Sequence, residues 1–377
     1  MCHMKIFTAI CGLILIASCE AGAKAQSNQS ASGLNDGNAE NILPVSDSER
    51  LDRLEALVEE RVSYTPQIHG VVRARWEGEF SHDDEPFRHR FQVRNARVFI
   101  EGNVLPTVSY YVRVDACDRG KFKILDAWAR WRFHDNWRIQ AGQFRIPYGI
   151  ECFRGPGTYV FANRSFLHKY ILNMRNVGLR AGYYGTKIPL VFEAGLFNST
   201  AMADHDKWQR AVNFAAKMNY RVGPVTLSTS FASVEPDSVR MNLWCGGATY
   251  TSGRWLFEAE YQNKHYTNKA HKATQGWNIF GVYTLPLVNK GVFNRLDFMA
   301  RYDGMTDCSN GTRNDDGLLI TNDSRRQRLT VGAQIAYVKM PLKALIRLNY
   351  EHFFYPSGIA AAVGESNKVV AELVVRF

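Results

Sequence analysis

The last ten residues, Lys368-Val-Val-Ala-Glu-Leu-Val-Val-Arg-Phe377, already indicate the class of fold. Every second residue from Val369 onward is apolar, whereas the other face carries Lys368, Glu372 and Arg376. Alternation with a period of two is typical of a β-strand whose two faces meet different surroundings. Ten tilted residues are also long enough to cross a thin membrane. The segment therefore predicts a membrane-spanning strand, with the last strand of a soluble β-sandwich as the alternative.

The same kind of pattern recurs from His69 onward and predicts sixteen strands. Their expected ranges are 69–80, 88–103, 107–117, 122–134, 136–146, 175–184, 189–198, 209–222, 224–235, 239–252, 254–265, 274–285, 293–303, 325–338, 342–354 and 366–377. Tight turns such as Gly223-Pro224 follow the even-numbered strands, and longer polar loops such as 304–324 follow most odd-numbered ones. This segregation is typical of bacterial outer-membrane barrels, whose turns face the periplasm. We therefore expect an all-β fold, a 16-stranded antiparallel transmembrane β-barrel. The even number of strands places both termini of the chain on the periplasmic side.

Composition excludes two other classes of protein. The chain has 377 residues, a formal net charge of +10, 12% aromatic residues and a mean hydropathy of −0.27. It contains no run of 18 apolar residues, so a polytopic helical membrane protein is excluded. The aromatic content is too high for a disordered chain.

The N-terminal 63 residues divide into three expected segments. Lys5, the apolar run 6–18 and the small residues Ala23-Lys-Ala25 predict a signal peptide over 1–25 that directs export. A lipoprotein-type site before Cys19 is the alternative. Polar residues 26–45 predict a flexible leader.

Residues 46–63 predict a short periplasmic α-helix that precedes the barrel domain, 64–377. Leu51, Leu54 and Val58 follow heptad spacing, which favours a coiled coil, although two heptads are marginal in isolation. Docking of this helix on its own chain is the alternative. Outside the signal peptide the cysteines are Cys117, Cys152, Cys245 and Cys308, which we expect to be mostly free thiols. A bridge between Cys117 and Cys152 is the alternative.

Charged side chains occupy one face of several predicted strands. In 71–80 the apolar face holds Val72, Ala74, Trp76, Gly78 and Phe80, and the polar face holds Arg73, Arg75, Glu77 and Glu79. In 125–133 the expected apolar face is Leu125, Ala127, Ala129, Trp131 and Phe133. An arginine that faced lipid at mid-bilayer would cost about 2–4 kcal/mol. The charged faces must therefore point inward, onto the water-filled lumen of a barrel of this size.

Positive charge concentrates in the first part of the barrel. Residues 64–180 hold 16 Arg and 3 Lys against 11 acidic residues, a balance of +8. Such a field enriches anions, and guanidinium groups match phosphate and carboxylate oxygens. The predicted pore-lining, anion-binding residues are Arg73, Arg75, Arg94, Arg97, Arg113, Arg130, Arg132, Arg138, Arg145 and Arg180. The alternative is that they pair with neighbouring carboxylates and only brace the wall.

The segment Pro147–Met174 is too aromatic for a solvent-exposed loop. We expect it to pack inside the channel and narrow it, with Arg154, Arg164, His168 and Lys169 at the constriction. The alternative is a loop folded over the rim at a subunit contact.

Four motifs together resemble a known family. They are Gln140-Ala-Gly-Gln-Phe-Arg-Ile-Pro-Tyr-Gly-Ile-Glu151, the preceding Leu125-Asp-Ala-Trp-Ala129, and the following Asn163-Arg-Ser165 and Arg175-Asn-Val-Gly178. With them the chain resembles the phosphate-selective porin O and P family over roughly 69–377. The resemblance implies sixteen-stranded homotrimeric porins of the outer membrane, often with a short N-terminal coiled coil. It also implies phosphate selectivity that rests on an arginine ladder and a lysine cluster, whereas residues 64–180 contain only three Lys.

We therefore expect passive diffusion of small anions, phosphate among them, with a general nutrient porin as the alternative. A barrel enzyme would need a paired nucleophile and base, and the sequence has no GxSxG motif. A non-conducting adhesin is a further alternative. No motif predicts a metal site or a cofactor. The expected partners are small anions, outer-membrane lipid and two further copies of the chain, and nucleic acid is not expected, because the arginines form no exposed stripe.

Overall fold

The structure is a computed structural model that describes residues 64–377 apart from 83–84, 119–120, 201, 236–238, 289–290, 340–341 and 363. The signal peptide, leader and helix predicted over 1–63 lie outside the described residues. The strands are β1 (Gln67–His82), β2 (Glu85–Leu105), β3 (Val108–Asp118), β4 (Lys121–His134), β5 (Trp137–Arg145), β6 (Arg175–Tyr184), β7 (Leu190–Asn198), β8 (Val212–Val222), β9 (Val225–Val234), β10 (Met241–Ser252), β11 (Trp255–Tyr266), β12 (Thr274–Pro286), β13 (Arg295–Met305), β14 (Arg326–Lys339), β15 (Leu342–Phe354) and β16 (Lys368–Arg376). The short helices are η1 (Glu151–Phe153), η2 (Leu167–Ile171), η3 (Met202–Asp204) and η4 (Thr267–Lys269). None of the helices in this part of the chain is long and apolar enough to cross a membrane.

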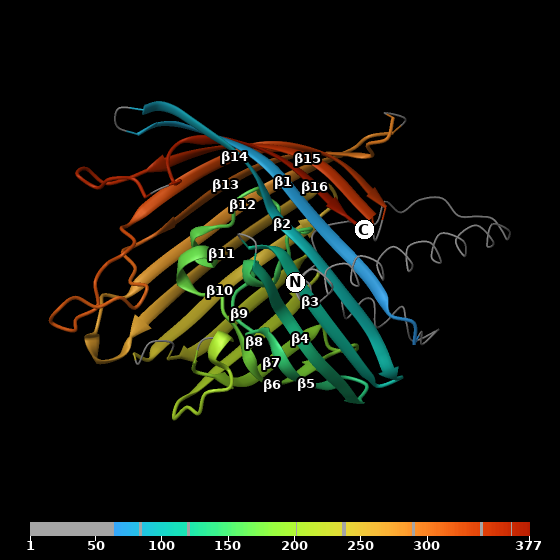
Figure 1. Ribbon diagram of the computed structural model, residues 1–377. Coiled ribbons are helices and arrows are strands. Elements are labelled where there is room, and N and C mark those ends of the chain that lie inside the picture. Colours follow the sequence, from blue (N-terminus) through green and yellow to red (C-terminus); the bar gives the residue numbers. More distant parts are fainter. Residues whose placement is uncertain are drawn as a thin grey trace, which may run out of the picture. The chain divides into compact units, whose positions relative to one another are not determined.

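The strands form one closed antiparallel barrel (Figure 1). Each strand pairs with its neighbours in sequence, and β1 closes the ring against β16 with Val71 opposite Arg376. The closure continues to the end of the chain, where Gly70 N donates to Phe377 O at 2.7 Å and Phe377 N donates to Gly70 O at 3.0 Å. The barrel confirms the predicted fold class and excludes the sandwich. All sixteen predicted ranges correspond to strands.

Turns and loops are segregated as the sequence predicts. Gly223 and Gly253 lie in two-residue turns after β8 and β10, and both have φ of +55°. A tight hairpin requires positive φ, which glycine adopts without a steric penalty. The long connections, 146–174 and 306–325, follow β5 and β13 at the opposite end of the strands.

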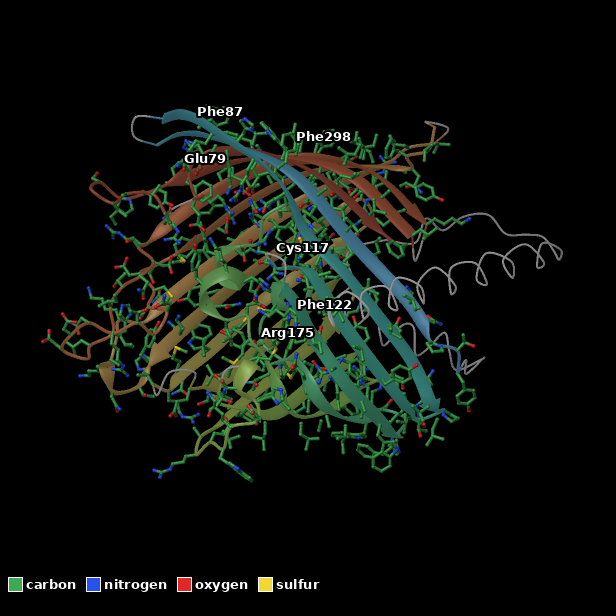
Figure 2. All side chains as sticks on the ribbon, viewed as in Figure 1. Glu79, Phe87, Cys117, Phe122, Arg175 and Phe298 are labelled. Carbon is green, nitrogen blue, oxygen red and sulfur yellow. The ribbon has the colours of Figure 1, made fainter. Side chains whose placement is uncertain are left out.

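The two faces of the wall differ as predicted. On β1, Arg73 is 2% exposed, whereas Val72 is 41% exposed. Phe87 and Phe298 are exposed on the outer surface as well (Figure 2). The outer face is thus apolar and suited to lipid, and the charged face is turned inward.

Leu125 departs from this alternation. The sequence pattern places it on the outer face, but its side chain is buried at 7% exposure and lines an interior cavity. The register between β3 and β4 shifts here, because Arg113 lies opposite Asp126 and Val114 lies opposite Ile124. The extra residue forms a β-bulge, which reverses the direction of the side chain. The prediction for Leu125 was therefore wrong.

Candidate functional site

Residues 147–174, here called the inner loop, cross the interior of the barrel. The backbone N–H of Ile150 donates to Glu260 of β11 at 2.8 Å, and that of Phe166 donates to Asp303 of β13 at 2.9 Å. Ala162 N–H donates to Asn349 of β15 at 2.8 Å. Contacts to three strands far along the wall require the loop to lie inside the barrel, where Figure 1 shows the green segment. This agrees with the predicted inward packing.

Cationic side chains of the wall hold the backbone of the inner loop. Arg73 donates to Ala162 O at 2.7 Å, Arg301 to Asn163 O at 2.9 Å, Arg328 to Arg164 O at 2.7 Å and Arg347 to Tyr159 O at 2.6 Å. A buried carbonyl requires a donor, and charged donors make the stronger hydrogen bonds. The sequence reasoning missed the three C-terminal arginines because it weighed only the charge excess over 64–180.

The largest cavity described, about 1110 Å³, lies between the inner loop, the first four strands, and residues of β14 and β16, and is here called the main cavity. Its charged lining residues are Arg73, Arg75, Glu77, Arg90, Arg94, Arg97, Asp115, Lys123, Arg164, Lys169, Arg328, Glu365 and Lys368. Ten of these are cationic and three are acidic. A cavity with this lining attracts anions, since the wall is of low dielectric and focuses the field.

Several predicted arginines are braced by acidic or amide partners. Arg73 pairs with Glu372 at 2.5 Å, Arg75 with Glu77 at 2.9 Å, Arg97 with Asp115 at 2.7 Å, Arg113 with Asp126 at 3.5 Å and Arg180 with Glu193 at 2.8 Å. Arg130 donates to Gln140 at 3.1 Å. These contacts give buried guanidinium groups polar partners. All of them except the Arg75–Glu77 pair, which lies within β1, also join neighbouring strands.

Arg94 and Arg145 differ from this braced group. Within the described part of the chain neither has an ion pair with a carboxylate. Arg94 is exposed in the main cavity. Arg145 is buried opposite Arg175 in the register of β5 and β6, and its Nη1 has no hydrogen-bond partner among the described residues. Arg94 is thus the predicted residue with the clearest access to a solute.

The four predicted constriction residues have different surroundings. Arg164, His168 and Lys169 line the main cavity. Arg154 does not line it, because its guanidinium pairs with Glu258 of β11, with Nη1 2.7 Å from Oε1.

The pKa values of two side chains of the inner loop, His168 and Tyr159, respond to the charges around the loop. Burial and then Arg164 lower the pKa of His168 well below its usual value, so the imidazole is neutral. Burial would raise the pKa of Tyr159, but Arg164, Arg97 and Arg145 outweigh it and lower that pKa. The lowered pKa of Tyr159 indicates an excess of cations around the loop, whereas the lowered pKa of His168 reflects burial first and the arginines second.

The remaining predicted arginines, Arg132 and Arg138, do not line the main cavity. Arg138 lies over the ring of Tyr184 at 4.3 Å, and Arg132 donates to Pro106 O at 3.2 Å near a turn. The main cavity therefore brings together Arg73, Arg75, Arg94 and Arg97 from the predicted wall set, but not Arg113, Arg130, Arg132, Arg138, Arg145 or Arg180.

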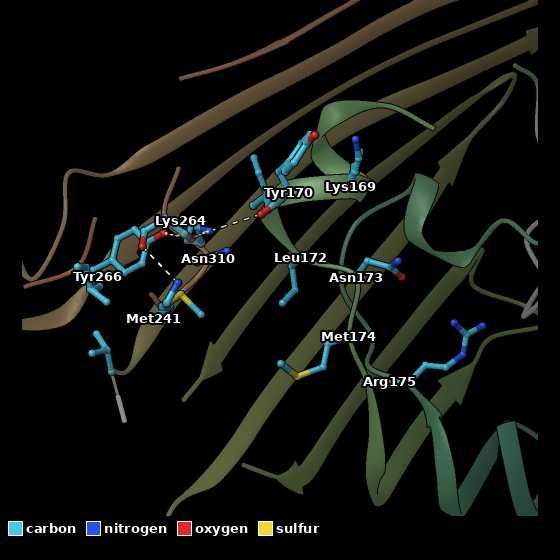
Figure 3. A pocket seen from close by; sticks show the side chains of 15 residues that line it. Lys169, Tyr170, Leu172, Asn173, Met174, Arg175, Met241, Lys264, Tyr266 and Asn310 are labelled. Atoms are coloured by element: carbon cyan, nitrogen blue, oxygen red, sulfur yellow. Dashed lines mark hydrogen bonds between the residues drawn. The ribbon is translucent and has the colours of Figure 1, made fainter. Parts of the chain in front are cut away.

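A second cavity of about 440 Å³ lies between the end of the inner loop, β10, β11 and the loop after β13 (Figure 3). Lys169 and Asn173 line both cavities, so the segment that carries them lies between the two. Lys264 Nζ lies 3.0 Å from Cys308 Sγ and 3.3 Å from Ser309 O, and these contacts fix the loop after β13 to β11.

Cys117, Cys152, Cys245 and Cys308 are free thiols, so no Cys117–Cys152 bridge is present. Burial raises the pKa of Cys152 to about 12, which makes that thiol unreactive. Among the described residues no group of three or more His, Cys, Asp or Glu is placed to hold a metal ion.

Comparison with protein families identifies the chain. The sequence profile described as "Phosphate-selective porin O and P" matches residues 75–284, more than half of the chain. The chain belongs to this family. The match runs from β1 to β12 and includes the inner loop. It confirms the resemblance seen in the sequence and makes this protein a bacterial outer-membrane porin rather than a barrel enzyme.

Solved structures confirm the porin fold at low sequence identity. OmpF of Salmonella typhi in complex with daunomycin has a TM-score of 0.59 and 12% identity, over 83% of this chain and 97% of that one. An anion-selective porin from Comamonas acidovorans has a TM-score of 0.57 and 9% identity, over 83% and 98%. The trimer form of OmpT from Vibrio cholerae has a TM-score of 0.55 and 10% identity, over 83% and 99%. No curated protein sequence matches the chain.

Proposed function

We propose that this porin carries small anions, phosphate among them, by passive diffusion through the main cavity. The observation that supports the proposal is the lining of that cavity, with ten cationic and three acidic side chains. Water-filled space bordered by such a lining lowers the free energy of an anion along the whole path and raises that of a cation.

In this proposal the lining residues have two different roles, one structural and one in contact with the solute. The ion-paired arginines Arg73, Arg75 and Arg97 hold the wall and the inner loop in place. Arg94 and Arg164 have no carboxylate partner among the described residues and are the groups that contact the solute. Planar guanidinium groups offer paired N–H donors to phosphate oxygens.

Lysines also contribute to the lining. Lys123 and Lys169 come from the N-terminal part of the barrel, and Lys368 is supplied by β16, which the ring closure places beside β1. The three ammonium groups add positive charge to the lining as point charges, of which Lys169 contacts Glu365 and Lys368 lies 3.8 Å from Glu351. Phosphate is thus a suitable solute even though 64–180 contains few lysines.

The proposed assembly is a homotrimer in the outer membrane. The support is family membership together with the trimer form of the Vibrio cholerae porin, which shares the fold. Residues 46–63 would lie in the periplasm in this arrangement, where three copies held together by the barrels could form a short coiled coil.

Reversal potentials of the reconstituted porin in planar bilayers under a KCl gradient test the proposal. We expect anion selectivity, and we expect Arg94→Gln to reduce the chloride-to-potassium permeability ratio by about two- to fivefold, since one charge beside a water-filled path changes the free energy of an ion by up to about 1 kcal/mol. Arg221→Gln is the matched control, because Arg221 is exposed at the end of β8 and does not line the main cavity. Cation selectivity of the unmodified protein would refute the proposal.

A non-selective nutrient porin is the second candidate. It is favoured by the pairing of Arg73, Arg75, Arg97 and Arg180 with carboxylates, which neutralises much of the positive charge. Equal permeation of chloride and potassium, unchanged in Arg94→Gln, would support this candidate.

A further inference from the structure

A small third cavity lies beneath the tip of the inner loop. It measures about 20 Å³ and is lined by the loop residues Gly155–Thr158 and by Val71, Arg97, Phe99, Arg113 and Arg376. The wall residues come from β16, β1, β2 and β3, which are consecutive around the barrel. The cavity therefore lies where the loop tip meets the seam at which the barrel closes.

The charges around this cavity are unbalanced. Three of its lining residues are arginines and none is acidic. Arg97 is paired with Asp115 through Nε at 2.7 Å, and Arg113 lies 3.5 Å from Asp126. Arg376 has no ion pair with any described carboxylate. Its neighbour across the β15–β16 ladder is Lys343, whose Nζ donates to Gly157 O of the loop tip at 3.3 Å. A buried cation without a counter-charge is unfavourable in a protein interior.

Two of the residues that line this cavity carry N–H groups without a hydrogen-bond partner. Arg376 is 5% exposed, and its Nε and Nη2 have no hydrogen-bond partner among the described residues. Arg97 is 7% exposed, and its Nη1 is likewise without a partner there. Buried polar groups in proteins are nearly always hydrogen-bonded, so two such groups on one cavity indicate a ligand that accepts hydrogen bonds and carries negative charge.

The size of the cavity selects the class of anion. A volume of 20 Å³ is enough for one particle of about the size of a water molecule. A tetrahedral oxyanion has five heavy atoms and does not fit, whereas a monatomic halide does. We propose that this cavity is a halide site, occupied by chloride, in which Arg376 and Arg97 bind the ion and fasten the tip of the inner loop to the barrel seam.

Gly157 gives this site its shape. A Cβ atom on Gly157 would come within 3.0 Å of Arg376 Cδ and 3.6 Å of Val71 Cγ2. The glycine therefore lets the loop tip approach the aliphatic part of Arg376, which lines the cavity. The halide is held in this site and not transported, so the proposal is independent of the anion selectivity of the main cavity.

Thermal unfolding of the full-length protein in detergent tests the site. We expect bromide or chloride to raise the Tm in a saturable manner, on the order of 5 °C at a hundredfold excess over the dissociation constant, because a ligand that binds only the folded state stabilises it. Potassium gluconate at the same ionic strength should give no such rise. In Arg376→Gln the halide-dependent rise should be lost, and in Gly157→Ala it should be reduced although no charge is removed. Arg325→Gln, which removes an exposed arginine, should keep the full rise.

Anomalous diffraction from crystals grown in bromide gives a direct measurement. A peak between the guanidinium groups of Arg97 and Arg376 is expected. If Arg376→Gln does not assemble, the halide-dependent Tm of Gly157→Ala and the bromide peak still test the proposed site. Equal stabilisation by halide and gluconate, or a halide-dependent rise that Gly157→Ala and Arg376→Gln leave intact, would overturn the proposal, as would bromide crystals without the peak.

Discussion

Arg154 and Glu258 form a buried ion pair that joins the inner loop to β11. Both oxygens of Glu258 accept from the guanidinium, and Glu258 also accepts from Thr249 at 3.0 Å. Burial would lower the pKa of Arg154, but Glu258 outweighs it and raises that pKa, so the guanidinium stays charged. The arrangement explains why Arg154, predicted at the constriction, does not line the main cavity: a planar guanidinium has a carboxylate of matching geometry beside it.

Removing one partner of this pair should destabilise the barrel strongly. Arg154→Met leaves the Glu258 carboxylate buried without its cation, which should lower the free energy of unfolding by about 3–5 kcal/mol. Urea unfolding of the protein in lipid vesicles measures the change. The double variant Arg154→Met, Glu258→Met is the control and should recover much of the loss, because neither charge then remains. A double variant as unstable as Arg154→Met would show that the pair acts through packing alone.

Among the elements, the loop 355–367 between β15 and β16 meets the inner loop through Glu365. This carboxylate contacts Lys169, accepts from Tyr170 Oη at 2.6 Å and pairs with Arg326 of β14 at 2.6 Å. Burial would raise its pKa, but Lys169 and Arg326 outweigh burial and lower it. A carboxyl whose pKa is lower in the folded state stabilises the fold above its unfolded pKa, and this stabilisation is lost as the pH falls through the folded pKa.

We therefore expect a decrease in stability below about pH 4.5, the ordinary value for this carboxyl. The free energy of unfolding measured by urea between pH 6 and pH 3 should fall less steeply in Glu365→Gln than in the unmodified protein. Glu235→Gln is the control, because Glu235 forms a partly exposed pair with Arg240. Identical pH profiles for Glu365→Gln and the unmodified protein would contradict the expectation.

The strands could be predicted from the sequence because each one separates lipid from a polar interior. Apolar and polar side chains therefore alternate along the strand, and this alternation is visible in the sequence. The inward packing of residues 147–174 could be predicted as well, since so many aromatic residues require burial. The partners of this loop could not, because Arg301, Arg328 and Arg347 lie more than a hundred residues away and meet it only through the closed ring. The β-bulge at Leu125 could not be predicted either, since a single extra residue leaves the alternation of apolar and polar side chains almost unchanged.

At the scale of the whole molecule, the inner loop divides the interior unequally. It is fastened to the C-terminal half of the wall through Arg301, Arg328 and Arg347. The main cavity lies chiefly along β1 to β4, and Arg328 of β14 and Lys368 of β16 complete its lining. The positive excess found in the N-terminal part of the sequence therefore borders the larger space, and the uneven distribution of charge along the chain becomes an uneven distribution across the barrel.

Cys117 offers a natural probe of this asymmetry. It is half-buried on β3 and lines the main cavity, whereas Cys152, Cys245 and Cys308 are buried. A thiol-specific methanethiosulfonate reagent should therefore modify Cys117 and reduce single-channel conductance. The anionic sulfonate reagent should react about tenfold faster than the cationic ammonium reagent of similar size, because the cationic lining concentrates anions beside the thiol. Cys117→Ser should abolish the effect of both reagents. Equal rates for the two reagents would show that ion pairing has neutralised the main cavity, and a faster cationic reagent would show that its potential is negative.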